Sequence, residues 1–325
     1  MPAAPITVAE KRTESKNQRL TGPRERASDR SFRWFVEGFG WLIIALAVTI
    51  GIALAIGSRL TWSKFGASFL WASDWDPVAD KFGALPFIYG TLASSALALL
   101  IAIPLGVGSA IFLAELAPRR ISDACTFLIE LLAAVPSVIL GLMGIFLLVP
   151  AVRSVEPTLI KFLGFLPFFK GVPYGVGLLT AGLILAIMIL PFITVIAREV
   201  LLAVPRPLKE AMLALGATRW ETVRGVSLPY ARSGIAGAVF LSLGRALGET
   251  MAVTMVIGNT PKISWSLLDP AYSMASVIAN ELTEAVGDLH LNSLIAIGLT
   301  LFGITVIING VARLMIYRVS QRGAA

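Results

Sequence analysis

Long apolar blocks alternate with short polar segments along this chain. A helix needs roughly 20 apolar residues to cross a bilayer, since each residue adds about 1.5 Å of length. Six blocks are long enough: residues 38–58, 86–114, 126–149, 175–197, 234–257 and 291–316. Pro104, Pro136 and Pro191 lie inside three of them, where a packed membrane helix can tolerate a kink. The pattern predicts an all-α, polytopic membrane protein with six transmembrane helices.

Composition supports a membrane environment and argues against several kinds of site. Hydrophobic residues make up 56% of the chain and charged residues only 14%, outside the range of soluble domains. The single cysteine, Cys125, and the single histidine, His290, exclude a disulfide framework and a metal site rich in either residue. We therefore expect no metal and no cofactor. The net charge of +7 resides mostly between the apolar blocks, so membrane lipid and not nucleic acid is the expected partner.

The distribution of lysine and arginine predicts the orientation. Nineteen of them lie in the first 35 residues, in the loops after the second and fourth blocks, and at the C-terminal end. The remaining loops hold seven. Because positive charge is retained on the cytoplasmic side, both termini are expected in the cytoplasm.

The chain divides into three parts. Residues 1–35 are polar and of mixed charge, which predicts a disordered basic arm on the cytoplasmic side. Residues 36–58 are expected to form the first transmembrane anchor. The alternative is a secretory signal peptide, but the long polar arm in front and the full spanning length favour an uncleaved anchor. Residues 82–318 then form a transmembrane domain with an unusually long cytoplasmic loop at 198–233.

This loop has the pattern of two short helices joined at a glycine corner. Pro207 suits the first turn of a helix, and Gly216 suits the left-handed cap that ends it. Thr218 and Glu221 have capping-box spacing, so a second helix is expected to begin there and to stop at Pro229. Such an element can transmit a partner's motion to the membrane helices. The alternative is an amphipathic hairpin resting on the inner leaflet.

The same loop resembles the signature of ABC-importer permeases, with the matching residues Glu210, Ala211, Gly216, Val226, Leu228 and Pro229. Met212 and Val226 replace the alanine and isoleucine of that signature. The resemblance implies a type I ABC-importer permease architecture, in which the loop docks in a cleft of a cytoplasmic ATPase through Glu210, Ala211 and Gly216. No G-x-x-x-x-G-K-[ST] stretch occurs in the sequence, so the ATPase is expected on a separate chain.

Arg245 and Glu249 are charged residues inside the fifth block. Each charge costs roughly 2.5–3.5 kcal/mol on membrane-insertion scales. Their spacing of four places them on one helical face, within reach of a salt bridge. One interpretation is a structural ion pair. The other is that Arg245 binds an oxyanion, while Glu249 holds the guanidinium when the path is empty or accepts a hydrogen bond from protonated phosphate.

Four further stretches resemble the PstC-type permease of the bacterial phosphate-uptake system: residues 82–92, 130–142, 244–259 and 274–281, the third of which reads GRALGETMAVTMVIGN. The resemblance implies that Arg245 and Glu249 lie on the phosphate path. It also implies a complex in the bacterial plasma (inner) membrane with a second related permease, an ATP-binding cassette ATPase dimer and an extracytoplasmic phosphate-binding protein. The chain itself would not be an enzyme.

Three alternatives stay open. The chain could be a permease for another oxyanion, such as sulfate or molybdate. It could be a stand-alone channel or proton-coupled carrier that uses Arg245 and Glu249 as a filter or relay. It could also be a structural or regulatory membrane subunit. Ser137, beside Pro136, is either a hydrogen-bond donor on the path or a helix-packing serine.

Overall fold

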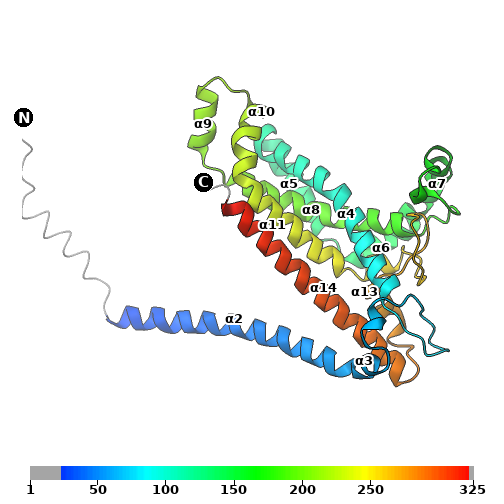
Figure 1. The fold of residues 1–325 in the computed structure, drawn as a ribbon. Coiled ribbons are helices and arrows are strands. Elements are labelled where there is room, and N and C mark those ends of the chain that lie inside the picture. Colours follow the sequence, from blue (N-terminus) through cyan, green and yellow to red (C-terminus); the bar gives the residue numbers. More distant parts are fainter. Residues whose placement is uncertain (1–22, 322–325) are drawn as a thin grey trace, which may run out of the picture. The chain divides into compact units, whose positions relative to one another are not determined.

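The computed structural model describes residues 23–321, and this part of the chain is helical apart from loops and an isolated bridge between Asp76 and Lys81. Figure 1 labels most of the helices. In chain order they are α2 (Pro23–Gly57), α3 (Arg59–Phe65), η1 (Gly66–Leu70), α4 (Leu85–Ile111), η2 (Phe112–Leu116), α5 (Arg119–Ala133), α6 (Ser137–Met143), η3 (Gly144–Leu148), α7 (Val149–Leu163), η4 (Pro167–Phe169), α8 (Leu178–Leu202), α9 (Arg206–Ala214), α10 (Arg219–Thr222), η5 (Val223–Ser227), α11 (Leu228–Leu247), α12 (Met251–Thr254), α13 (Met274–Glu281) and α14 (Asp288–Gln321).

Six helical runs are long and apolar enough to cross a membrane, as the sequence predicted. They are Arg30–Gly57, Leu85–Leu116, Ser137–Leu163, Leu178–Leu202, Arg219–Leu247 and Asp288–Tyr317. The chain divides into two units between Ala53 and Leu54, and the first unit contains most of α2. This helix begins at Pro23, so residues 23–35, expected as part of a disordered arm, are helical. Residues 1–22 of that arm lie outside the described residues.

The core of the second unit forms around α8. This helix packs against α4 and α11, and α11 packs in turn against α14 (Figure 1). Its Gly182 allows α4 to come close, because an added Cβ would lie 2.5 Å from Cδ2 of Leu97. Small residues of this kind let membrane helices pack tightly. Fully buried Ile184, Ile189 and Ile193 then fill the centre of the bundle.

The bounds predicted for the third span, residues 126–149, are wrong. α5 ends at Ala133, and α6 begins at Ser137 after Pro136, which has φ −58° and ψ 138°. Proline lacks an N–H and disfavours helical geometry at the preceding residue, which can kink a helix or end it, and at Pro136 the helix is broken. The third candidate span accordingly runs over Ser137–Leu163. By contrast, Pro104 and Pro191 do lie within continuous helices, as expected.

The fifth span also begins earlier and ends earlier than predicted. Helical backbone is continuous from Arg219 to Leu247, and the expected stop at Pro229 does not occur. A π-helical turn, η5, precedes α11 and places Pro229 in the first turn of that helix. The wider π turn changes which carbonyls are paired, so the missing proline N–H is tolerated.

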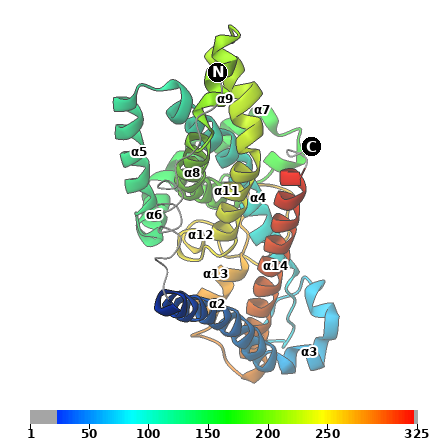
Figure 2. The ribbon, with the colours of Figure 1, turned by 90° about the vertical axis from the view of Figure 1, so that its left-hand side faces the viewer.

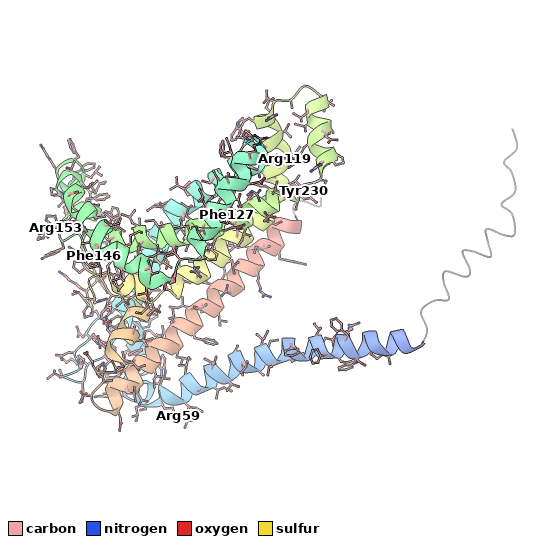
Figure 3. All side chains as sticks on the ribbon, turned by 180° about the vertical axis from the view of Figure 1, so that it is seen from behind. Arg59, Arg119, Phe127, Phe146, Arg153 and Tyr230 are labelled. Carbon is pink, nitrogen blue, oxygen red and sulfur yellow. The ribbon has the colours of Figure 1, made fainter. Side chains whose placement is uncertain are left out.

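The second unit has two distinct ends. α9 projects at one of them, where the C-terminal end of α14 also lies (Figures 1 and 2). Arg119 and Tyr230 are at this same end, and Arg59 is at the opposite one (Figure 3). Loops that the charge distribution assigned to one side of the membrane therefore meet at one end of the unit.

Candidate functional site

The loop between α8 and α11 has the two-helix form that its sequence predicted. Pro207 lies in the first turn of α9, and Gly216 follows the helix with φ +85°, in the left-handed region that favours glycine. The capping box is also confirmed. The backbone N–H of Thr218 donates to Oε2 of Glu221 at 2.7 Å, and the N–H of Glu221 donates to Oγ1 of Thr218 at 3.3 Å.

The residues expected to contact an ATPase are all exposed. Glu210 and Ala211 lie on α9 and Gly216 lies just after it, and no residue of α9 is buried. Several apolar side chains on this segment are also uncovered, and Leu215 is 85% exposed. The helix thus presents one carboxylate together with apolar surface at the end of the second unit.

A partly buried ion pair connects α9 to the end of the second span, and the sequence analysis did not identify it. Nζ of Lys209 lies 2.7 Å from Oε1 of Glu115, which belongs to η2. Their side chains are only 18% and 11% exposed. Lys209 also donates to the backbone carbonyl of Leu201, on α8, at 3.3 Å. One lysine therefore links α9 to two membrane helices.

We expect Lys209→Met to lower the melting temperature, because it leaves the Glu115 carboxylate partly buried and unpaired. The double variant Lys209→Glu, Glu115→Lys should recover more than half of the loss. Thermal melting of the purified protein measures the effect. Lys262→Met, at an exposed lysine, is the control. Equal melting temperatures of Lys209→Met and parent would contradict a stabilising role for this pair.

Arg245 lies near the end of α11, beside a cavity of about 430 Å³ between α8, α11 and α14. Its guanidinium carbon is 4.2 Å from the ring centroid of Phe192, on α8, a cation–π arrangement. The guanidinium makes no hydrogen bond or ion pair with any residue in the range 23–321 that the structure describes. Its N–H donors thus lie over an aromatic ring and have no acceptor among the described residues.

Arg245 and Glu249 do not form the ion pair that one interpretation of the sequence assigned to them. α11 ends at Leu247, and Gly248 closes it with φ −90° and ψ 0°, so the two charged residues do not share one continuous helix. Oε1 of Glu249 instead accepts a hydrogen bond from the backbone N–H of Ala252, at 3.3 Å, in the first turn of α12. Helical spacing correctly predicts a shared face only where the helix continues through both residues.

Other residues beside Arg245 were missed by sequence reasoning. The cavity lining also includes Phe192, Ser242, Thr305 and Asn309. Asn309 could have been identified from the sequence, since it is a polar amide within the sixth apolar block. Phe192 could not, because aromatic residues are common in membrane-spanning helices. Ser137, considered as a residue on the path, is half-buried at the start of α6 and does not line this cavity.

Residues 102–321 match the family described as "Binding-protein-dependent transport system inner membrane component". A phosphate transport system permease protein PstC of Mesorhizobium japonicum is 51% identical, over 92% of this chain and 93% of its own length. The PstC of Haemophilus influenzae is 49% identical, over 87% and 91%. Among solved structures, a chain of a bacterial alginate ABC transporter aligns with TM-score 0.61 at 16% identity, over 90% of this chain and 97% of its own.

Proposed function

Because the chain belongs to the PstC family of phosphate transport system permeases, within the binding-protein-dependent inner membrane components, we propose that it forms part of the membrane path for inorganic phosphate in an ATP-driven importer. The fold is the all-α, type I ABC-importer permease architecture expected from the sequence. The observation that carries the proposal is the guanidinium of Arg245, which lies beside a cavity and makes no hydrogen bond or ion pair with any described residue.

Arg245 would bind the anion in transit. A guanidinium offers two parallel N–H donors to one edge of a phosphate, which strengthens the contact and fixes its geometry. The ring of Phe192 orients the group without neutralising its charge. Glu249 remains a second proposed transport residue. It acts separately from Arg245, at the half-buried turn where α11 gives way to α12.

The proposed partners are a second related permease, an ATP-binding cassette ATPase dimer and an extracytoplasmic phosphate-binding protein. The chain has no P-loop motif, which supports a separate ATPase chain. The exposed segment of Glu210, Ala211 and Gly216 would dock on that ATPase, and the Lys209–Glu115 pair would pass its motion to the bundle. The chain itself would carry out no hydrolysis.

We place the protein in the bacterial inner membrane with both termini in the cytoplasm. The charge count supports this orientation, because the segments richest in lysine and arginine would then face the cytoplasm. The position of α9 at the end that also carries Arg119 and the end of α14 fits the same orientation (Figure 3).

Anion competition tests the proposed substrate. The complete complex, reconstituted in vesicles with its binding protein, should accumulate labelled phosphate in the presence of ATP. Unlabelled phosphate should suppress the signal, whereas sulfate and molybdate at equal concentration should leave it nearly unchanged. Accumulation of sulfate or molybdate instead of phosphate would overturn the substrate assignment and favour another oxyanion. Uptake without an ATPase would favour a stand-alone carrier.

A further inference from the structure

A serine that lines the cavity beside Arg245 has a hydroxyl group with no hydrogen-bond partner in the described bundle. Ser242 lies on α11, is only 1% exposed, and its Oγ has no hydrogen-bond partner among the described residues. Serine hydroxyls inside helices commonly bond to a backbone carbonyl of the preceding turn. Because the hydroxyl of Ser242 does not, its O–H is left without an acceptor, and a rotation of the side chain toward the cavity that this residue lines would bring it to an anion there.

Asn309, on α14, supplies the complementary group. Its Nδ2 donates to the backbone carbonyl of Thr305 at 2.9 Å. Only the NH₂ end of the amide can face that carbonyl, so the orientation of the side chain is determined, with Oδ1 on the other side. No partner for this Oδ1 is found in the part of the chain that the structure describes. The residue is exposed at the cavity, where Oδ1 can accept a hydrogen bond.

We propose that Arg245, Ser242 and Asn309 form one oxyanion site that selects an anion carrying a proton. This inference rests on the proposed function. Arg245 and Ser242 donate hydrogen bonds to unprotonated phosphate oxygens, and Oδ1 of Asn309 accepts one from the P–OH group. The acceptor role that the sequence suggested for Glu249 thus passes to a neutral amide on another helix.

Discrimination against sulfate follows from the fixed amide. Inorganic phosphate carries at least one proton near neutral pH, whereas sulfate carries none. A sulfate oxygen in the same place would face the lone pairs of Oδ1, and turning the amide over would break its bond to Thr305. A site built around a hydrogen bond to one ligand rejects the analogue that lacks it, because a polar group is left unpaired.

Protection of an introduced thiol tests the site directly. The complete, nucleotide-free complex carries Cys125→Ser, which removes the only cysteine of this chain, and Thr305→Cys as a reporter in the cavity. The rate of modification by a small anionic thiol reagent is measured alone, with inorganic phosphate, and with sulfate. Accessible cysteines of the other subunits are replaced beforehand. ATP-driven phosphate uptake by the same preparation is recorded separately.

Phosphate is expected to slow modification at least about tenfold and sulfate less than about twofold. With Asn309→Leu added, the two anions should protect equally. Asn292→Leu is the control on the same helix. Nδ2 of Asn292 makes the same bond to a carbonyl four residues earlier, that of Asp288, while its Oδ1 accepts a hydrogen bond from the backbone N–H of Leu60 at 3.4 Å. The preference of this control for phosphate should be retained.

Two results would overturn the inference. The first is an unchanged preference for phosphate in Asn309→Leu. The second is a reporter that neither anion protects in a complex that still imports phosphate, which would leave the proposed function standing and place the anion elsewhere. Absence of ATP-driven phosphate uptake by the parent complex would instead overturn the proposed function itself, and the site with it.

Discussion

Replacing Arg245 with alanine is expected to lower ATP-driven phosphate uptake at least about 100-fold, because two charge-assisted hydrogen bonds to the anion are lost. Assembly of the complex should be unaffected. The side chain is exposed, and beyond its cation–π contact with Phe192 the guanidinium makes no hydrogen bond or ion pair with a described residue, so its removal should cost the fold little. Phosphate uptake by Arg245→Lys should lie between that of the parent and that of Arg245→Ala, since an ammonium keeps the charge but not the planar guanidinium.

Uptake into vesicles and co-purification of the subunits measure these two effects separately. Arg59→Ala removes another exposed arginine, at the end of the unit opposite α9, and serves as the control (Figure 3). An Arg245→Ala complex that assembles and still imports phosphate at the parent rate would exclude Arg245 from the path. That result would favour the interpretation of this chain as a structural or regulatory subunit.

Glu210→Lys is expected to abolish uptake while the chain still folds and inserts. Glu210 is exposed on α9, and the charge change disturbs no contact within the described bundle. In a docked complex, however, the reversed charge would meet groups arranged for a carboxylate, and like-charge contacts at interfaces are strongly unfavourable. ATP hydrolysis by the complex should then no longer respond to the loaded binding protein.

Membrane fractionation establishes insertion of this variant, and pull-down of the ATPase establishes docking. Glu284→Lys, at an exposed glutamate between α13 and α14, is the matched charge reversal. Normal transport by Glu210→Lys would remove the docking hypothesis. It would return α9 to the alternative interpretation, an amphipathic hairpin on the inner leaflet.

Local chemistry made much of the fold predictable. Apolar block length predicted six spans, and single residues predicted the corner after α9, where only glycine readily adopts φ +85°. The helix boundaries were less predictable. Pro104 and Pro136 lie in equally apolar surroundings, yet the first is accommodated within α4 and the second separates α5 from α6. Tertiary packing decides between these outcomes, and the pattern of apolar residues along the sequence does not reveal it.

The candidate site was predictable only in part. A charge in an apolar block was enough to identify Arg245. Its surroundings come from three helices that are distant in sequence, so no spacing rule brings Phe192 or Asn309 to it. The predicted pairing with Glu249 failed because it assumed a helix that ends at Leu247. Likewise, Lys209 and Glu115 are 94 residues apart in the sequence, so only the tertiary fold brings them together.

Accumulation of labelled phosphate by vesicles with and without trapped ATP is the most direct test of ATP-driven phosphate import through this chain. The vesicles contain this chain, its second permease and the ATPase, with the binding protein added outside. We expect accumulation against a gradient that requires ATP and that is lost in both Arg245→Ala and Glu210→Lys. Equal phosphate entry in the absence of ATP, or entry unaffected by either variant, would contradict it.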